Sequence, residues 1–279
     1  MRYKTSYHVH TTYCDGKDSA EQMVLAALAK GFTHIGFASH APVAPHHKED
    51  MLMKKEDFYD YKKEVLRLQQ NYKDKIEIFL GLEYDCYEGE GMAKEIDPKE
   101  LDFFILSIHS LGIGKDKRPI DCSAKELEEL FDLAGGDVQE IVKRYYALLG
   151  EAVIEERAPV VGHIDIIKKN NKGSRYFNEK ENWYLDIVQK CLEQIRRAGS
   201  VVEINTGGVV RHGKECLYPS DEILEMLRDM DIGLMLNSDA HKAENIDFYY
   251  EEMIQKLKDM KIRELRILTK EGWICDEVD

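Results

Sequence analysis

Short apolar runs alternate with longer amphipathic stretches along this chain of 279 residues, and this alternation is the feature that most constrains its fold. Runs typical of β-strands cover residues 4–10, 34–40, 76–83, 103–109, 159–165, 201–205 and 232–239. Stretches with apolar residues at the i, i+3, i+4, i+7 spacing of amphipathic helices cover residues 18–31, 56–72, 137–156, 179–199, 220–230 and 243–260. Because this alternation favours parallel strands joined by right-handed helical crossovers, the sequence predicts an α/β fold.

Seven such units suit a parallel barrel that is close to the (β/α)8 type but one unit short. Several predicted strands are apolar on both faces, as strands between a barrel interior and its surrounding helices are. No Pro- or Ser-rich linker and no internal repeat divides the chain, so we expect a single domain over residues 1–279 with a core over about residues 3–260. The remaining segment, 261–279, contains the strand-like run 264–270 and is expected to close or cap the barrel.

Charge and hydropathy argue against two classes of partner. The formal net charge is −14, from 53 acidic and 39 basic side chains, and such a surface repels a phosphodiester backbone, so we expect no nucleic-acid partner. We also expect no membrane partner and a cytoplasmic location, because the chain lacks a long uncharged apolar window and an apolar N-terminal signal. The six cysteines are scattered, which favours reduced thiols. The sequence indicates no particular oligomer.

Every predicted strand ends in side chains that can bind a metal ion or a substrate. In chain order these are His8 and His10, His40, Glu83, His109, His163 and Asp165, Asn205, and Asp239 and His241. Because the carboxyl ends of parallel strands meet at one face, we expect one cluster rich in histidine and carboxylate. Such ligands favour Zn²⁺, Fe or Mn²⁺. The cluster has more ligands than one ion takes, so we expect two or three divalent ions, an arrangement typical of phosphoester hydrolysis.

Other candidates in the sequence favour simpler interpretations. His34 begins a strand and is expected to be structural, and His46 and His47 are expected in an exposed loop. Cys14 is more easily explained as a buried thiol than as a soft metal ligand. A guanidinium suits phosphate well, so Arg211, after the Gly-Gly turn at 207–208, is a candidate phosphate ligand.

In order, these polar segments resemble the motifs of the polymerase-and-histidinol-phosphatase (PHP) superfamily. The matching segments, between residues 3 and 242, are HVHTTYCDG, ASHAP, GLEYD, LSIHSL, VGHIDIIKK and NSDAH. Within the superfamily, SHAP, GHIDIIKK and EINTGG are similar to the histidinol-phosphatase branch, although the chain reads YCDG where many members read FCPHG. The resemblance implies a distorted (β/α)7 TIM-like barrel that hydrolyses L-histidinol phosphate to L-histidinol and phosphate in histidine biosynthesis.

The resemblance also implies specific metal positions. It assigns a first metal to His8, His10, Glu83 and Asp239, a second to Glu83, His109 and His163, and a third to Asp15, His40 and His241. It places Lys168 and Arg211 around the phosphate, where Asn205 is a further candidate contact.

The predicted mechanism is attack by a metal-activated water on phosphorus. Asp165 and His241 are both candidates for the acid that protonates the leaving alcohol, and Asp165 has the alternative role of orienting an imidazole ligand. Asp85, Glu88 and Asp121 are left as alternatives for binding the amine-bearing part of the substrate.

Other activities remain as alternatives. They are a PHP phosphoesterase acting on another small phosphomonoester or a nucleotide, and a non-catalytic metal-binding module. An amidohydrolase with a bridging lysine is disfavoured, because no predicted strand ends in lysine.

Overall fold

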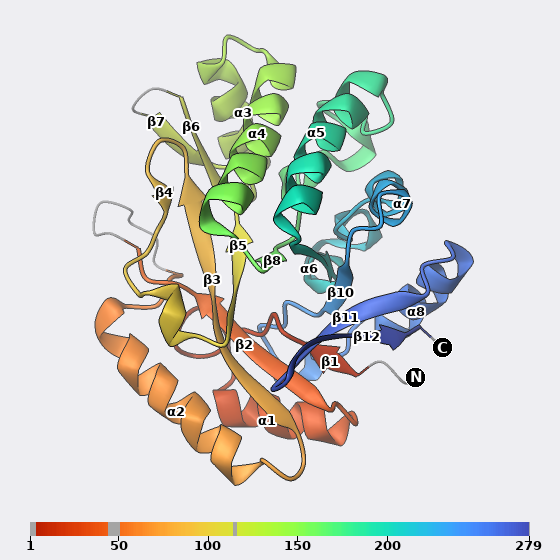
Figure 1. Cartoon of the computed structure of the whole chain (residues 1–279). Coiled ribbons are helices and arrows are strands. Elements are labelled where there is room, and N and C mark those ends of the chain that lie inside the picture. Colours follow the sequence, from red (N-terminus) through yellow and green to blue (C-terminus); the bar gives the residue numbers. More distant parts are fainter. Residues whose placement is uncertain (1–3, 44–50, 114–115, 279) are drawn as a thin grey trace.

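The computed structural model describes residues 4–43, 51–113 and 116–278, and its centre is a sheet of seven parallel strands whose spatial order follows their order in the chain. The strands are β1 (Thr5–Ser6), β2 (His34–His40), β3 (Glu77–Tyr87), β5 (Phe103–Ser107), β8 (Val160–Val161), β9 (Val201–Asn205) and β10 (Leu234–Asn237). Each strand pairs in parallel with the next one in this series. This order indicates a singly wound sheet in which each crossover advances one strand (Figure 1).

The first and last strands come together and nearly close the barrel. Beyond β1 and β10, Val9 and Ala240 form a parallel bridge, and the backbone N–H of His10 donates to the carbonyl of Ala240 at 3.0 Å. The backbone N–H of Tyr7 also donates to Oδ1 of Asn237 at 2.7 Å. The predicted α/β fold, a seven-unit barrel short of the eight-unit type, is therefore confirmed.

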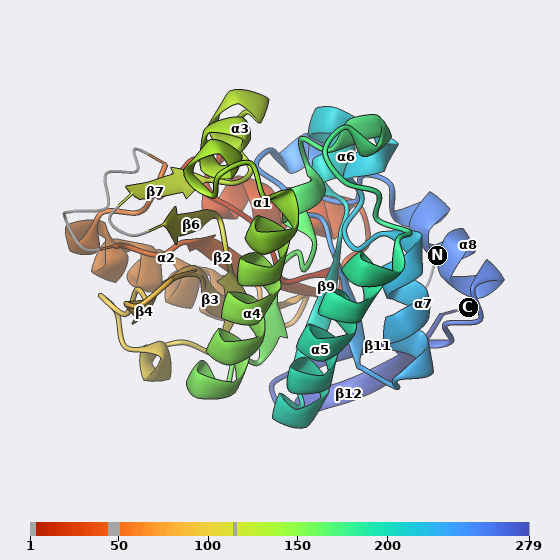
Figure 2. The ribbon, with the colours of Figure 1, turned by 90° about the horizontal axis from the view of Figure 1, so that it is seen from above.

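The helices lie around the outside of the strands (Figures 1 and 2). They are α1 (Ala20–Ala29), α2 (Phe58–Asn71), α3 (Ala124–Leu133), α4 (Val138–Glu156), α5 (Asn182–Ala198), α6 (Gly207–His212), α7 (Asp221–Asp229) and α8 (Tyr250–Asp259). In α2, the buried residues Phe58, Tyr61, Val65 and Leu68 recur every three or four positions, which is the spacing of one helix face. Ser19 and Gln22 form a capping box that starts α1.

Some elements differ from the sequence prediction because the chain leaves the sheet early or continues past it. β1 and β8 are only two residues long, since the chain turns after them toward the barrel mouth. β3 continues to Tyr87 and pairs with β4 (Gly91–Met92). After β5, the chain forms an unpredicted antiparallel hairpin from β6 (Ser110–Ile113) and β7 (Asp116–Pro119). The predicted loop with His46 and His47 lies outside the described residues.

The C-terminal residues form a separate hairpin of β11 (Glu264–Thr269) and β12 (Gly272–Glu277). The hydroxyl of Tyr7 donates to the carbonyl of Leu268 at 2.6 Å, and the N–H of Lys270 donates to Glu77, the first residue of β3. The hairpin therefore lies at the amino ends of the strands. We propose that it closes this end of the barrel, as expected for residues 261–279.

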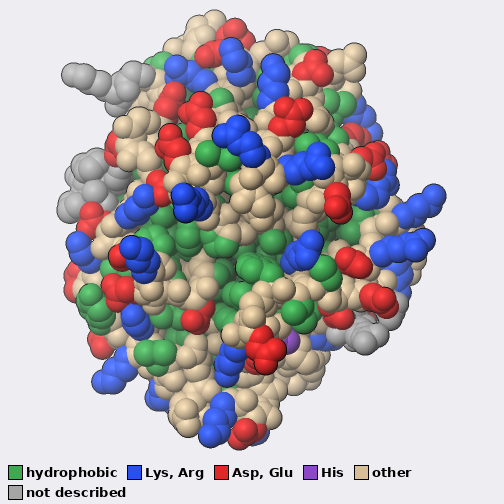
Figure 3. Space-filling view, viewed as in Figure 1, with side chains coloured by type: hydrophobic (Ala, Val, Ile, Leu, Met, Phe, Trp, Pro, Cys, Tyr) green, Lys and Arg blue, Asp and Glu red, His purple; other side chains and the backbone are tan. Residues whose placement is uncertain are grey.

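The molecular surface mixes both signs of charge. On the face shown in Figure 3, basic and acidic side chains are interspersed around a central area of hydrophobic side chains, without a continuous basic surface. Within the described ranges, no helix combines the length and the apolar character that a membrane crossing needs.

Candidate metal centre

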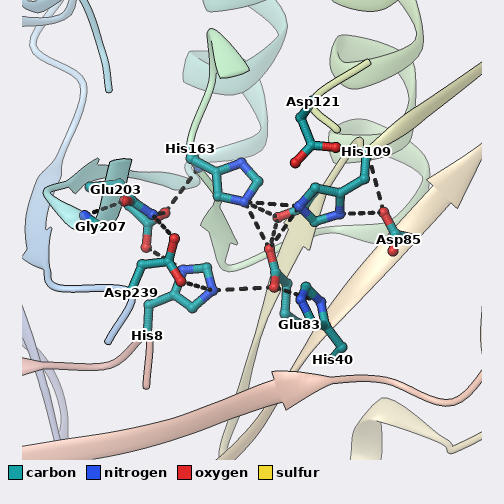
Figure 4. A network of polar contacts seen from close by, with 12 residues as sticks. His8, His40, Glu83, Asp85, His109, Asp121, His163, Glu203, Gly207 and Asp239 are labelled. Carbon is teal, nitrogen blue, oxygen red and sulfur yellow. Dashed lines mark hydrogen bonds and ion pairs between the residues drawn. The ribbon is translucent and has the colours of Figure 1, made fainter. Parts of the chain in front are cut away.

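The carboxyl ends of the strands bring together the side chains that the sequence singled out as metal ligands. They are His8, His10, Asp15, His40, Glu83, His109, His163, Asp239 and His241, and all except His8 line a cavity of about 990 Å³. His8 is completely buried and does not line the cavity. Figure 4 shows several of these side chains pointing toward one another from different strands. Residues more than 230 positions apart thus meet in one centre, as parallel-barrel topology requires.

Three overlapping sets of potential ligands can be distinguished among the described residues. They are His8, His10 and Asp239; His40, Glu83 and His109; and His10, Asp15, His40 and His241. Within each set the candidate ligand atoms lie within 4.8 Å of one another. His163 joins the second set, since its Nε2 lies 2.9 Å from Oε1 of Glu83. The arrangement has room for more than one cation.

Glu83 occupies the centre of the cluster. Its Oε2 lies 3.2 Å from Nε2 of His8 and 3.0 Å from Nδ1 of His40, whereas its Oε1 faces His163. The hydroxyl of Ser107 donates to Oε1 at 2.6 Å and orients the carboxylate. Burial alone would raise the pKa of Glu83, but the surrounding imidazoles hold that pKa well below its usual range. The charged form of Glu83 is thus stabilised by imidazoles that contact both of its carboxylate oxygens.

Several buried ligand atoms lack a hydrogen-bond partner, which is the observation that tests whether metal ions fit here. These atoms include Nε2 of His8, Nδ1 of His40 and Oδ1 of Asp15. In addition, Nε2 of His109 faces Nε2 of His163 at 3.2 Å, although two nitrogen lone pairs repel unless a proton or a cation lies between them. Burying such atoms without partners is unfavourable. Metal ions satisfy them, so the residues fit a metal centre.

Two carboxylates behind the cluster orient its imidazoles. Nδ1 of His8 lies 2.8 Å from Oε2 of Glu203, and Nδ1 of His109 lies 2.7 Å from Oδ1 of Asp85. In each ring this contact leaves Nε2 directed at the cluster, as metal-binding histidines require. The sequence analysis missed Glu203. The sequence does contain a signal for Glu203, because it is the only charged residue inside the apolar strand β9. It also lies two positions before Asn205 and hence on the same face of β9.

Asp239 links the cluster to Arg211. Nη2 of Arg211 donates to Oδ2 of Asp239 at 2.8 Å, and Nη1 lies 3.0 Å from Nδ1 of His241. Burial would raise the pKa of Asp239, but Arg211 and the neighbouring imidazoles hold it well below its usual range. Asp239 has a left-handed backbone with φ of 45°. A Cβ on Gly207 would lie 2.7 Å from Cβ of Asp239, so glycine makes room for this conformation.

Three predicted functional side chains lie behind the cavity wall instead of lining it. Nζ of Lys168 donates to the carbonyl of Leu217 and lies 3.2 Å from Oδ2 of Asp165, and both side chains are buried. The Asn205 amide contacts Glu203 and Asp239. Apart from Oδ1 of Asp165, which is buried without a hydrogen-bond partner, their polar atoms contact protein groups. None of the three side chains lines the cavity, so this geometry does not favour direct substrate contact by Lys168, Asp165 or Asn205. Arg211 and His241 do line the cavity.

The cavity rim carries charged side chains that the strand-end argument did not identify. They include Lys17, Lys117, Arg118, Lys169, Lys242, Glu126 and Glu244. Of the three acids left as alternatives, only Asp121 lies in the cavity with a carboxylate not committed to orienting an imidazole, and it faces Lys169 at 3.3 Å. Asp85 contacts His109, and Glu88 faces Arg144 away from the cavity. The strand-end argument could not find them, because they lie outside the predicted strands, for example Lys117 and Arg118 in β7 and Glu126 in α3.

The two residues expected to be structural lie as follows. His34 is at the amino end of β2, where its Nδ1 contacts the hydroxyl of Thr33 at 2.8 Å, far from the cluster along the same strand. Sγ of Cys14 lies 3.5 Å from Nδ1 of His10 and contacts the carbonyl of Thr11. Burial raises the pKa of the Cys14 thiol, which favours its neutral form. None of the six cysteines, all within the described ranges, forms a disulfide.

Several of the known proteins that resemble this chain are named as histidinol-phosphatases. The histidinol-phosphatase of Bacillus subtilis is 27% identical over 268 residues, covering 91% of this chain and 99% of that protein. A probable histidinol-phosphatase of Schizosaccharomyces pombe is 25% identical over 260 residues, covering 88% of this chain and 83% of that protein. The crystal structure of histidinol phosphate phosphatase from Lactococcus lactis, complexed with Zn, L-histidinol and phosphate, matches with a TM-score of 0.69 at 21% identity, covering 97% of this chain and 98% of that chain.

The PHP domain family matches residues 6–207, which is well over half of the chain. This match includes the ligand candidates from His8 to His163, whereas Asp239 and His241 lie beyond it and join the cluster through the fold. The chain therefore belongs to the PHP domain family.

Proposed function

We propose that this protein is a metal-dependent phosphomonoesterase that hydrolyses L-histidinol phosphate to L-histidinol and phosphate. The observation that carries the proposal is the convergence of nine imidazole and carboxylate side chains, several with unpartnered buried ligand atoms, around a cavity that also contains Arg211. Two relatives whose names denote this activity cover most of the chain, and the similar Lactococcus lactis protein is described as a complex with Zn, L-histidinol and phosphate.

The ligand set suits two or three divalent ions, with zinc, iron or manganese as the candidates. Glu83 would bridge, with His8, His10 and Asp239 on one side and His109 and His163 on the other, and Asp15, His40 and His241 would hold a third ion. Ions bound here would supply Lewis acidity at the phosphoryl group and favour ionisation of the attacking water. Burial lowers the pKa of His10 to about 3, so this imidazole is free of a second proton when an ion binds.

The chain's own residues would handle charge and protons during the displacement. A water molecule gives up a proton and its oxygen bonds to phosphorus while the ester P–O bond breaks, and the departing alkoxide takes a proton. Arg211 lines the cavity and can neutralise non-bridging phosphoryl oxygens. If only two ions bind, His241, whose side chain is 21% exposed and lines the cavity, is better placed than buried Asp165 to donate the proton. Asp121, which lines the cavity, would accept a hydrogen bond from the amine-bearing part of the substrate.

The test is phosphate release from L-histidinol phosphate, simple sugar phosphates and a phosphate bis-ester, with metal content measured on the same sample. We expect the highest kcat/KM for L-histidinol phosphate and loss of activity after chelation. A strong preference for the bis-ester would contradict the assigned substrate. As part of the same proposal, we expect the reaction to take place in the cytoplasm.

A further inference from the structure

Glu203 is a buried hub that connects four parts of the barrel. Its carboxylate is completely buried in β9 and does not line the cavity. Oε2 accepts hydrogen bonds from Nδ1 of His8 and Nδ2 of Asn237, both at 2.8 Å. Oε1 accepts from the backbone N–H of His163 at 3.1 Å and from Nδ2 of Asn205 at 2.8 Å (Figure 4). The four donors come from the β1, β8, β9 and β10 segments, all at the carboxyl ends of the strands.

Three of these four groups can only donate a hydrogen bond to Glu203. The N–H of His163 belongs to the backbone and only donates. Oδ1 of Asn237 accepts from the N–H of Tyr7 at 2.7 Å, which directs its amide nitrogen at Glu203. Oδ1 of Asn205 accepts from the N–H of Gly207 at 2.9 Å, with the same consequence. Obligate backbone donors thus determine the orientation of both amides.

His8 is the remaining donor, and its ring can carry the proton on either nitrogen. Because both oxygens of Glu203 accept from the other donors, Nδ1 of His8 must carry the hydrogen of this contact, and the lone pair of the neutral ring lies on Nε2. That Nε2 is buried without a hydrogen-bond partner, 3.2 Å from Oε2 of Glu83 and 3.9 Å from Oδ1 of Asp239. The lone pair is therefore directed at the centre of the ligand cluster.

We propose that Glu203 is a positioning residue that holds His8 in the tautomer able to bind a metal ion, and that it thereby sets the affinity of the metal position formed by His8, His10 and Asp239. The inference rests on the proposed metal centre but not on the identity of the substrate.

The decisive variant is Glu203→Gln, which keeps the size of the side chain. A glutamine amide can accept on one side only, so its NH₂ faces either Asn237 and His8 or His163 and Asn205. Of these donors, only the His8 ring can adapt, by moving its proton to Nε2, where it blocks the metal. We expect one zinc equivalent per chain to bind about tenfold to hundredfold more weakly than in the wild type. The measurement is titration of the metal-free protein with zinc against a chromophoric chelator.

Two control variants separate an effect on the orientation of His8 from an effect on the stability of the protein. Glu77→Gln makes the same chemical change at the amino end of β3, where Glu77 accepts from the N–H of Lys270, and should leave zinc binding unchanged. Asn237→Ala removes another donor of the hub but retains the contact between His8 and Glu203. It should lower the melting temperature while zinc affinity falls much less than in Glu203→Gln. Equal losses of zinc affinity in Asn237→Ala and Glu203→Gln would overturn the proposal.

If Glu203→Gln does not fold, ring ¹⁵N spectra of the zinc-loaded wild type provide the test. We expect a proton on Nδ1 of His8 and the chemical shift of a metal-bound nitrogen on Nε2, and a protonated Nε2 would overturn the proposal. Neither measurement uses a substrate. A protein that binds zinc as described but does not hydrolyse L-histidinol phosphate would therefore contradict the proposed function alone.

Discussion

The two ends of the barrel use the same strands but opposite kinds of side chain, and β3 shows both. Along its interior face, Phe79 packs with Tyr7 at a ring-centroid distance of 5.7 Å, Gly81 leaves room for Phe103, and Glu83 lies at the centre of the ligand cluster. The amino-terminal half is thus an aromatic core, and the carboxyl-terminal half is a polar site with unpartnered buried atoms. We infer that the aromatic half supplies most of the stability. The polar half can therefore contain buried groups that are unfavourable without a cation.

The largest effect is expected from Glu83→Ala, because this carboxylate contacts imidazoles from several strands. We expect phosphatase activity to be abolished, and His10→Ala to do the same, while circular dichroism shows a folded chain. Metal content should fall in the same samples. Retention of wild-type rates by these variants, or by a metal-stripped wild type, would contradict the role of the cluster.

At the other end, Phe103→Ala should mainly reduce stability. The Phe103 ring packs against Tyr7 at 6.0 Å and occupies the space left by Gly36 and Gly81, so its removal leaves a cavity. We expect the free energy of unfolding to fall by about 3–5 kcal/mol, measured by urea denaturation. Zinc stoichiometry should stay that of the wild type in the folded variant. Loss of zinc binding in proportion to stability would show that the two halves are not separable.

Arg211→Lys tests the polar end without removing a charge. A lysine cannot reproduce the contacts of the planar guanidinium with Asp239 and His241 while also binding a phosphoryl oxygen. We expect kcat/KM for L-histidinol phosphate to decrease about a hundredfold, by analogy with the loss of one transition-state hydrogen-bond donor. The melting temperature should change little. A variant with unchanged kcat/KM would exclude Arg211 from phosphate binding.

The zinc affinity of the metal-free protein should also depend on pH. Burial lowers the pKa of His8 and of His109, but neighbouring carboxylates more than compensate and raise both well above the ordinary value. These protons must leave before an imidazole binds zinc, so zinc affinity should rise with pH below the raised pKa values, by about tenfold per unit for each proton displaced. Calorimetry in buffers of different ionisation enthalpy would measure the released protons. Affinity independent of pH between 5 and 8 would contradict this charge state.

The smallest effect is expected on the outside of the amino end. Trp273 in β12 is 38% exposed on the C-terminal hairpin. Trp273→Ser should change the free energy of unfolding by no more than about 0.5 kcal/mol and leave catalysis unchanged. A matched comparison is Leu265→Ala in β11, where the side chain is completely buried and about 2–5 kcal/mol should be lost. Similar losses in both variants would show that the exposed face of the hairpin also contributes to stability.

Much of the fold could be predicted from local periodicity. The runs 34–40 and 201–205 coincide with β2 and β9, and each predicted helix contains one of the observed helices. The strand-end argument also predicted that His8, Glu83 and Asp239 share one site, because the carboxyl ends of parallel strands in a barrel all lie at the same end. The hairpin of β6 and β7 was missed, since both strands are only four residues long and β7 has no apolar alternation.

The sequence by itself therefore determined the barrel and the set of side chains at its mouth, because periodicity and strand direction are properties of the chain. Only the tertiary structure decided which of them reach the cavity. Lys168 and Asp165 lie behind its wall while Lys169 lines it, because the 3-10 turn after β8 (Ile166–Lys168) directs adjacent lysines to different sides. Likewise, Glu203 accepts four hydrogen bonds only because the fold brings donors from four strand segments to its carboxylate. Such contacts depend on partners distant in sequence, which no local pattern encodes.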